Sequence, residues 1–413
     1  MPRVVLVLPT ATYRATDFVL AADALGIEVV VASEAAPPLS QAVVVDLDDA
    51  SAAAGLLAGF DDGRPVDAVV AVDDRGAVLA ATAAARLGLP GNPPDAVAAT
   101  RDKVELRRRL AAGEVAQPRH AVLAPGGDPA EVAAEVGFPV VVKPSGLSGS
   151  VGVIRADDRP GAVAAAARAW ALWDGPLVVE RFVAGAEVAV EGLLRGGRLE
   201  VLAVFDKPDA PDGPYFEETI YVTPSRHPSA SLDELARLVA RACAAVGLVE
   251  GPVHAEARLG PNGPVLLEVA ARSIGGLCAR ALRFGAGISL EELILRHALG
   301  LPTDGMAREQ GASGVMMLPI PRSGVLRAVR GQDAARAVPG VAGLELTIRP
   351  GRPVRALPEG DRYLGFLFAR AGEPAEVETI LRAAHACLQV DIDDSADGGD
   401  GDSSEGAGGG SAA

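Results

Sequence analysis

The sequence predicts a mixed α/β fold whose first part is a parallel sheet with helices on both faces. Short apolar runs alternate with helical patterns over the first hundred residues, which is typical of strand–helix–strand units. Hydrophobic residues make up 49% of the 413-residue chain and charged residues 22%, so the chain has enough apolar side chains for a buried core. No apolar run approaches the roughly 20 residues that span a bilayer.

Strands and helices follow one another in turn over the first hundred residues. The expected strands and helices cover 3–8, 16–25, 27–32, 42–45, 66–72 and 75–88. Gly26 and Gly88 end the two helices, because glycine readily adopts the left-handed conformation found after a helix. The first strand is followed by Pro-Thr-Ala-Thr-Tyr-Arg and not by the G-x-G-x-x-G turn of dinucleotide-binding folds, so a dehydrogenase is not expected.

The rest of the chain mixes helices with strands that return as hairpins, which predicts an α+β arrangement. Thr100 is expected to cap a helix over 101–112, and a glycine-rich turn is expected near 144–152. Further helices are expected over 161–172, 232–246 and 374–387. Further strands are expected at 177–182, 187–194, 199–205, 253–259, 265–269, 312–318, 324–330, 345–348 and 364–370. From Asp391 the sequence is mostly Asp, Gly, Ser and Ala, which predicts a disordered acidic tail.

Charge and cysteine content restrict the classes of function. The formal net charge is −16 at pH 7, which argues against a nucleic-acid-binding surface. The cysteines, Cys243, Cys278 and Cys387, lie far apart in apolar stretches, so we expect core thiols and neither disulfides nor a zinc site. The N-terminus lacks a signal-peptide pattern. The expected location is the cytoplasm, with no membrane partner.

Lysines are rare in this chain, and their positions are informative. Only three occur, at Lys103, Lys143 and Lys207, against 35 arginines. A lysine retained in so arginine-rich a chain indicates a site that needs a compact ammonium group. The alternative is that the three lysines survive by accident.

The string VVVKPSGLSGSVGV, which starts at Val140, combines Lys143 with a glycine-rich loop. Gly146, Gly149 and Gly152 let backbone N–H groups curl around an anion, and the lysine adds a point charge. The string lacks the Gly-Lys-Ser/Thr of a Walker motif. It predicts a phosphate-binding loop, with an ordinary hairpin turn and a surface lysine as the alternative.

The next strand, in PLVVERFVAGAEVAVEGLL from Pro176, ends at Glu180, Phe182 and Val183. Such a strand end offers backbone hydrogen bonds and an apolar wall to a purine. Glu187 follows a turn and is placed to accept hydrogen bonds from ribose hydroxyls. The alternative is a half-buried hairpin with alternating acids, which is how we interpret Glu191.

Two further acids, Glu256 and Glu268, stand on strands joined by the Gly260–Pro264 turn, so both are expected on one face of an antiparallel hairpin. Facing carboxylates repel unless a cation bridges them, and Mg²⁺ with phosphate oxygens suits this arrangement. The alternative is a pair of solvated acids. Arg272 is placed to meet a phosphoryl group, whereas His254 either orients a ligand or is a satisfied core residue.

The order of these residues resembles the ATP-grasp superfamily of carboxylate–amine ligases over about 1–390. Within it, the segments PTATYRATDF, FDKPDAPDGPYFEETIYVTPS and GASGVMMLPIP are similar to the L-amino-acid ligase group. The resemblance implies four parts: a Rossmann-like pre-ATP-grasp domain (1–95), an ATP-grasp domain (96–310) with a lid (about 117–183), a C-terminal lobe (311–390) and the tail (391–413).

The resemblance also implies a site that binds ATP and Mg²⁺, with Mn²⁺ as a substitute. It assigns phosphate contacts to Lys103, Lys143 and the loop. It also places Lys207 beside the substrate pocket and implies that Arg272 and Lys207 are the catalytic residues. The residues implied to bind nucleotide within the loop are Ser145, Gly146, Ser148, Gly149 and Ser150. The metal ligands are Glu256 and Glu268, although Ala270 stands where the family often has an asparagine that holds the second ion.

The implied reaction is ATP-dependent amide or peptide bond formation through an acyl phosphate. Its partners are a small carboxylate and an amine. The Gly275-Gly276 backbone is expected to bind the carboxylate, and Arg272 is expected to face the transferring group or the oxyanion. Glu217 or Glu218 offers a counter-charge to the amine, with a solvated acidic loop as the alternative. A homodimer is common among similar ligases. Two alternatives stay open: another ATP-grasp chemistry, such as carboxylation or a purine-synthesis ligation, and a non-catalytic nucleotide-binding regulator.

Overall fold

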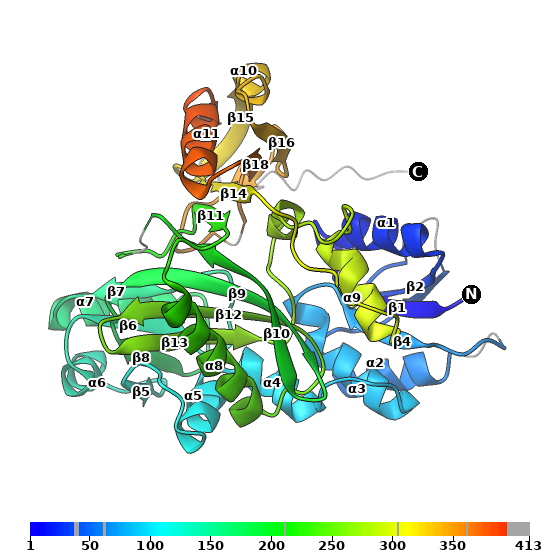
Figure 1. Ribbon diagram of the computed structural model, residues 1–413. Coiled ribbons are helices and arrows are strands. Elements are labelled where there is room, and N and C mark those ends of the chain that lie inside the picture. Colours follow the sequence, from blue (N-terminus) through cyan, green and yellow to red (C-terminus); the bar gives the residue numbers. More distant parts are fainter. Residues whose placement is uncertain (37–40, 61–62, 210–211, 304, 361, 395–413) are drawn as a thin grey trace, which may run out of the picture.

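The computed structural model describes residues 1–36, 41–60, 63–209, 212–303, 305–360 and 362–394. Figure 1 shows an N-terminal part in blue, a central part in cyan and green, and a C-terminal part in yellow to red. Helices and strands alternate or mix throughout, so the predicted α/β fold class is confirmed. No helix in these ranges is long and apolar enough to cross a membrane.

The N-terminal part is a parallel sheet in the order β3-β2-β1-β4, as predicted. Its strands are β1 (Arg3–Val7), β2 (Glu28–Ser33), β3 (Gln41–Val44) and β4 (Ala68–Ala71). Its helices are α1 (Ala15–Leu25), α2 (Ala50–Ala58) and α3 (Ala77–Leu87). Side chains of β1 alternate between two cores: Leu6 packs in the cluster of α1, and Val5 packs in the cluster of α2 and α3. The loops after β1 and β4 therefore lie together at the carboxyl edge of the sheet.

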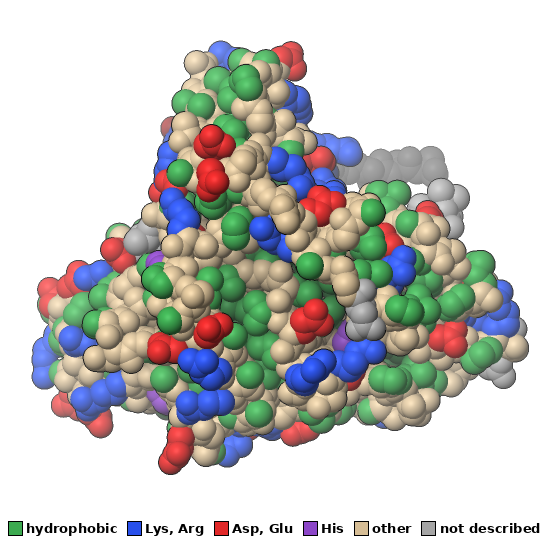
Figure 2. Space-filling model, in the orientation of Figure 1, with side chains coloured by type: hydrophobic (Ala, Val, Ile, Leu, Met, Phe, Trp, Pro, Cys, Tyr) green, Lys and Arg blue, Asp and Glu red, His purple; other side chains and the backbone are tan. Residues whose placement is uncertain are grey.

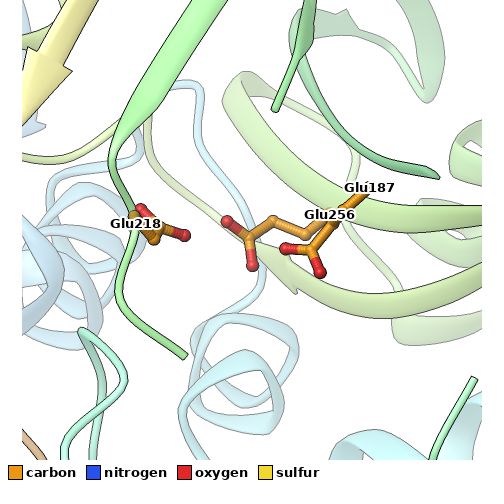
Figure 3. A group of neighbouring side chains, drawn as sticks. All are labelled: Glu187, Glu218 and Glu256. Atoms are coloured by element: carbon orange, nitrogen blue, oxygen red, sulfur yellow. The ribbon is translucent and has the colours of Figure 1, made fainter. Parts of the chain in front are cut away.

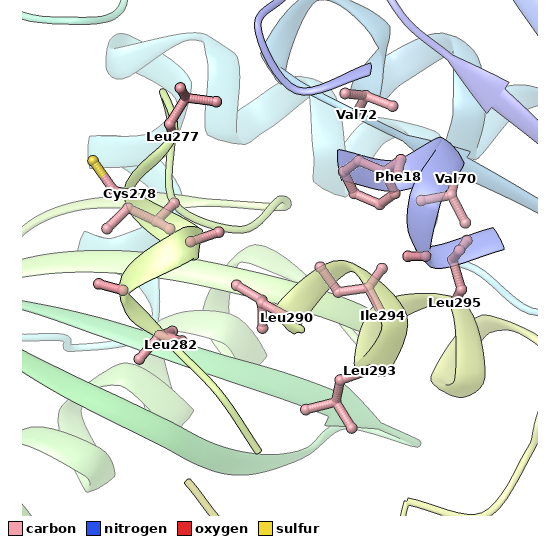
Figure 4. Close-up of a cluster of buried hydrophobic side chains, with 14 of the residues drawn as sticks. Phe18, Val70, Val72, Leu277, Cys278, Leu282, Leu290, Leu293, Ile294 and Leu295 are labelled. Atoms are coloured by element: carbon pink, nitrogen blue, oxygen red, sulfur yellow. The ribbon is translucent and has the colours of Figure 1, made fainter. Parts of the chain in front are cut away.

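A helix from much later in the sequence, α9 (Leu290–Ala298), completes the core of the N-terminal part. Figure 4 shows its Ile294 and Leu295 close to Phe18 of α1 and Val70 of β4. Ser289 caps α9 by accepting a hydrogen bond from the Glu292 backbone at 3.1 Å. The sequence analysis missed this helix. Its packing ties the central part firmly to the N-terminal sheet.

The central part is built on an antiparallel sheet of eight strands in the order β13-β12-β9-β10-β11-β14-β18-β16. The strands from the central part are β9 (Ala186–Arg195), β10 (Arg198–Asp206), β11 (Ile220–Thr223), β12 (Gly251–Gly260) and β13 (Gly263–Ala270). The helices beside it are α4 (Pro94–Arg101), α5 (Lys103–Ala112) and α8 (Ser229–Val246). The expected cap at Thr100 is wrong, because Thr100 lies inside α4. Asp102 caps α5 instead, by accepting from the Val104 backbone at 2.9 Å.

The lid is a smaller four-stranded sheet in the order β5-β8-β6-β7. Its elements are β5 (His120–Leu123), α6 (Pro129–Val136), β6 (Val140–Pro144), β7 (Ile154–Ala156), α7 (Arg159–Trp170) and β8 (Leu177–Arg181). These elements fall within the predicted range of 117–183. The domain boundaries themselves stay predictions.

The C-terminal part continues the eight-stranded sheet across the predicted boundary at 311, because β14 pairs with β11 of the central part. Its strands are β14 (Ala312–Leu318), β15 (Gly324–Arg330), β16 (Val341–Leu346), β17 (Pro353–Val354), β18 (Gly365–Ala371) and β19 (Gln389–Asp393), and its helices are α10 (Gln332–Arg336) and α11 (Pro374–Ala386). The tail was expected to begin at Asp391, but Asp391 to Asp393 pair with β15. Residues 395–413 of the expected tail lie outside the described residues.

On the face shown in Figure 2, positively and negatively charged side chains are interspersed with hydrophobic ones. The C-terminal part stands above the junction of the other two parts in the same view. This arrangement lets residues from all three parts contribute to one cavity.

Candidate active site

A cavity of about 570 Å³ lies where the three parts of the chain meet. Its walls come from the loops after β1 and β4, the lid, strands β12 and β13, and the C-terminal part. Five residues that the sequence analysis assigned to one site all line it: Lys103, Lys143, Glu256, Glu268 and Arg272. Their individual roles stay predictions.

Glu180 lies at the end of β8 and is held by two cations. Its Oε1 accepts from Arg107 Nε at 2.8 Å, and its Oε2 pairs with Lys143 Nζ at 2.8 Å. Burial alone would raise the pKa of Glu180, but the charges of Arg107 and then Lys143 outweigh it and lower the pKa to about 2. The buried network fixes the Lys143 side chain at the cavity wall. Arg107 was missed, although its place four residues after Lys103 on α5 puts both on one helix face.

The glycine-rich loop reaches the cavity at Ser148, Gly149 and Ser150. Gly149 and Ser150 both have positive φ angles, of 65° and 60°, which shape a tight backbone turn. The Lys103 ammonium donates to the carbonyl of Leu147 at the start of this turn. A serine at positive φ is uncommon and shows that the surrounding structure constrains the loop.

Two residues assigned to the loop, Ser145 and Gly146, are not brought to the cavity wall. The Ser145 backbone donates to the carbonyl of Pro176 at 3.2 Å and accepts from Lys103 N at 2.9 Å. Gly146 lies against the Trp173 ring, where a Cβ atom would overlap the indole. Ser145 is thus held by backbone pairing and Gly146 by packing on Trp173, so both form the base of the loop.

Phe182 and Val183, which were expected to form an apolar wall for a purine, both line the cavity. The Phe182 ring lies between the guanidinium groups of Arg155 and Arg258, at 4.3 and 5.0 Å from its centroid. However, the Phe182 N–H donates to the carbonyl of Pro139 at 2.9 Å. This N–H is therefore already paired, and the expected backbone hydrogen bonds from the strand end to a purine stay a prediction.

Glu256 and Glu268 are directly opposite each other in the register of β12 and β13, on one face as predicted. Among the described residues, Glu268 has no hydrogen bond or ion pair, and it faces the cavity. Glu256 accepts from the Tyr221 hydroxyl at 3.2 Å. Carboxylate oxygens are the ligands that Mg²⁺ prefers, so this donor set fits the ion. Ala270 is buried beyond the pair and offers no ligand atom.

Lys207 lies directly after β10 and behind the cavity wall, not on it. Its ammonium donates to Glu187, Glu218 and Glu256, each at 2.8 Å. Burial would lower the pKa of Lys207, but the three carboxylates raise it well above its usual value. Of the two acids proposed for a substrate ammonium, the structure brings Glu218 to the cavity and not Glu217.

Glu187, predicted to accept from ribose, has both carboxylate oxygens engaged. Oε1 accepts from Lys207, and Oε2 accepts from Arg258 Nε at 3.0 Å. A ribose hydroxyl would have to share one of these oxygens, which have two lone pairs each.

His254 lines the cavity and is held by two acids. Its Nδ1 contacts Glu191, and its Nε2 lies 3.5 Å from Glu256. Glu191 also accepts from the backbone of Ile274 at 3.0 Å, which anchors the segment after Arg272. Our interpretation of Glu191 as a hairpin acid is wrong, because its side chain is 1% exposed. Its burial depends on partners from other segments, so the sequence carried no signal for it.

Arg272 connects the central and N-terminal parts. Its Nε donates to Asp74 at 3.0 Å, and Asp74 follows β4 at the carboxyl edge of the parallel sheet. Arg14, from the loop after β1, donates to Ser273 Oγ at 2.8 Å. Asp74 and Arg14 were missed, although ligand sites of parallel sheets usually lie at this edge.

The far end of the cavity is apolar. Gly275 and Gly276 line it, together with Tyr13, Tyr363 and Phe366. The rings of Tyr13 and Tyr363 lie 6.1 and 6.0 Å from that of Phe366, in edge-to-face arrangements. Gly276 borders these rings, because a Cβ on it would lie 2.7 Å from the Phe366 ring.

Three segments match known family models. Residues 19–91 match the ATP-grasp N-terminal domain, residues 136–281 match the ATP-grasp domain, and residues 316–393 match the L-amino acid ligase C-terminal domain 2. A D-alanine–D-alanine ligase of Pseudomonas putida is 33% identical over 224 residues, which cover 51% of this chain and 67% of that protein.

Two longer relatives match as well. Carnosine synthase 1 of Gallus gallus is 31% identical over 65% of this chain, and an uncharacterised protein of Sinorhizobium fredii is 28% identical over 72% of it. The matches span 32% and 62% of the lengths of these two proteins.

The solved structure of an L-amino acid ligase from Bacillus licheniformis has the same fold. It superposes with a TM-score of 0.80 and 24% identity, over 95% of this chain and 99% of that one. A carboxyaminoimidazole ribonucleotide synthase from Aspergillus clavatus, complexed with ATP, superposes with a TM-score of 0.70 and 18% identity, over 94% of this chain and 98% of that one. These two likenesses concern the fold.

Proposed function

The chain belongs to the ATP-grasp family, and from this we propose that it is an ATP-dependent ligase that joins a carboxylate to an amine. One observation carries the proposal: Glu256 and Glu268 lie opposite each other in a cavity that also holds Lys103, Lys143 and a constrained glycine-rich turn. Carboxylates for a hard cation and lysines for phosphate, in one cavity, suit the binding of a magnesium nucleotide.

In the proposed reaction, ATP phosphorylates the carboxylate, the amine attacks the acyl phosphate, and ADP and phosphate are released with the amide. Bound Mg²⁺ supplies charge neutralisation on the phosphates, and Glu256 and Glu268 would hold it. Lys143, fixed by Glu180, adds a positive charge on the phosphate side. Arg272, fixed by Asp74, places a guanidinium beside the transferring group or the oxyanion.

Besides binding phosphate, the lid would exclude water from the site, because an acyl phosphate exposed to water would hydrolyse. The loop is held to the C-terminal part through Gly152, whose N–H donates to the carbonyl of Pro358 at 2.9 Å. Arg168 of the lid also contacts Glu359. These contacts close the lid over the cavity and keep water from the reacting atoms.

The small-molecule substrates are proposed to include an amino acid with an apolar side chain. The aromatic wall of Tyr13, Tyr363 and Phe366 provides apolar contact, and the adjoining Gly275-Gly276 backbone offers N–H donors for a carboxylate. Glu218 is placed for a substrate ammonium. A homodimer and a cytoplasmic location complete the proposal, since the free thiols suit a reducing compartment.

A substrate screen tests this function. The protein is incubated with ATP, Mg²⁺ and pooled amino acids, and released phosphate is measured beside the masses of the products. We expect phosphate release that depends on amino acids and a product lighter than the two substrates by one water. Phosphate release that requires bicarbonate would favour a carboxylase instead. Nucleotide binding without turnover under all conditions would favour a regulator.

A further inference from the structure

The contacts of Lys207 set it apart from the other two lysines. Its ammonium has three protons, and it donates one to each of three carboxylates, Glu187, Glu218 and Glu256, at 2.8 Å. The residue is 5% exposed, and its ammonium also lies 4.9 Å from the centre of the Tyr221 ring. Lys207 therefore has no proton left for another partner unless one of these hydrogen bonds breaks.

The three carboxylates are close enough together to share a metal ion if no other cation stood between them. One oxygen from each lies within 4.8 Å of the other two. Figure 3 shows the side chains of Glu187 and Glu256, from neighbouring strands β9 and β12, and of Glu218, from the segment before β11, turned toward a common point. Hard divalent cations take such oxygens at about 2.0–2.6 Å, so an ion at this point would collide with the ammonium.

The chain's own cations already compensate the charge of the cluster. Arg258 donates to the second oxygen of Glu187 at 3.0 Å and reaches Asp212 at 3.1 Å. Glu256 has His254 beside it, at 3.5 Å. With Lys207 in place the acids are paired, whereas without Lys207 one buried carboxylate, Glu187, and two partly buried ones would face one another.

We propose that the Lys207 ammonium is a resident cation that holds Glu187, Glu218 and Glu256 together and excludes a divalent ion from the space between them. A divalent ion is then confined to the side of Glu256 that faces Glu268. Lys207 acts through the carboxylates, as a positioning residue, and does not itself contact the substrate. Removing the ammonium converts the cluster into a metal site.

The number of Mn²⁺ ions bound per chain tests the proposal directly. The protein is titrated with Mn²⁺, free Mn²⁺ is measured by electron paramagnetic resonance, and bound Mn²⁺ is the difference from the total. The titration contains neither nucleotide nor substrate, so its outcome is independent of the ligase assignment. We expect Lys207→Met, which keeps most of the stem, to bind one Mn²⁺ more per chain than the wild type. Adding Glu218→Gln should abolish this extra site. Lys143→Met is the matched control, because it uncovers one carboxylate, Glu180, and should gain no ion.

Thermal unfolding is a second measurement, and it still tests the proposal if Lys207→Met is less stable than the wild type. In EDTA, Lys207→Met should unfold at a lower temperature than the wild type, and Mn²⁺ should raise its Tm by more than it raises that of the wild type. The proposal is overturned if Lys207→Met gains no Mn²⁺, or stays unfolded when Mn²⁺ is present. It is equally overturned if the wild type loses a bound Mn²⁺ on Glu218→Gln, since the ion would then share the cluster with Lys207.

Discussion

Replacing Gly276 by alanine tests how tightly the apolar end of the cavity is packed. Gly276 has a φ of 58°, which costs an L-residue about 1–2 kcal/mol. Its Cβ would lie 2.7 Å from two carbons of the Phe366 ring. Phe366 is buried and in contact with Tyr13 and Tyr363, so the ring has little room to move. Overpacking adds about 1–3 kcal/mol, which gives an expected loss of roughly 2–5 kcal/mol.

A matched glycine separates the two contributions. Gly26, after α1, has a φ of 63°, and no atom lies within 4 Å of the Cβ it would carry. Gly26→Ala should therefore show the backbone strain alone. Chemical unfolding gives the loss in free energy of unfolding for each variant. The loss for Gly276→Ala minus the loss for Gly26→Ala is the cost of overpacking at Gly276. Adding Phe366→Leu to Gly276→Ala should recover part of that difference, because the smaller side chain can move away.

Kinetics should follow the same geometry. We expect Gly276→Ala to raise the KM for the amino-acid substrate and to leave the KM for ATP unchanged, because Gly276 contacts Phe366 of the C-terminal part, whereas the proposed phosphate contact, Lys143, lies on the lid. Equal losses of stability in the Gly276 and Gly26 variants would refute the close contact with Phe366. A change in the KM for ATP alone would place Gly276 at the nucleotide end.

Three further predictions concern the polar wall. Glu268→Gln should nearly abolish turnover with an unchanged Tm, because Glu268 has no hydrogen bond or ion pair among the described residues; wild-type dependence on Mg²⁺ concentration would reject its role as a ligand. Lys143→Ala should weaken binding of an ATP analogue in calorimetry about 10- to 100-fold and keep the fold, since Glu180 retains Arg107; unchanged affinity would argue against a phosphate contact. The pKa of Glu180 is lowered from its ordinary 4.5 to about 2 in the folded chain, so its contribution of about 3 kcal/mol is present above pH 4.5 and lost as the pH falls toward 2. Unfolding curves of Glu180→Gln should lack this part of the acid dependence, and identical pH profiles for variant and wild type would contradict it.

Local patterns in the sequence were sufficient for much of the fold. The parallel sheet follows from apolar runs separated by helical segments, and the pairing of Glu256 with Glu268 follows from the short turn between two strands. The fold class and the family assignment needed no tertiary information.

Other features depend on contacts between distant segments. The packing of α9 on α1 brings together residues more than 250 positions apart, and the sequence of α9 does not indicate which element it packs against. The pairing of β14 with β11 carries one sheet across a predicted domain boundary for the same reason.

In the site, too, residue types were predictable from the sequence and their contacts were not. Lysines and acids were recognised by type and order, but their hydrogen bonds were not. Lys207 was expected to be a catalytic residue beside the substrate pocket, whereas three carboxylates from separate segments accept all its protons. Glu191 was set aside as one of the alternating acids of a hairpin, whereas in the structure it is buried against His254 and Ile274 from other segments. Sequence spacing carries no information on such partners.

Trapping the acyl phosphate tests the central claim most directly. Hydroxylamine replaces the amine in a reaction with ATP, Mg²⁺ and single amino acids, and the resulting hydroxamate is measured beside released phosphate. We expect a hydroxamate that requires both ATP and the carboxylate, forms in equal amount to phosphate, and is missing with Glu268→Gln. Phosphate released without any hydroxamate, across the whole set of amino acids, would contradict the assignment as a carboxylate–amine ligase.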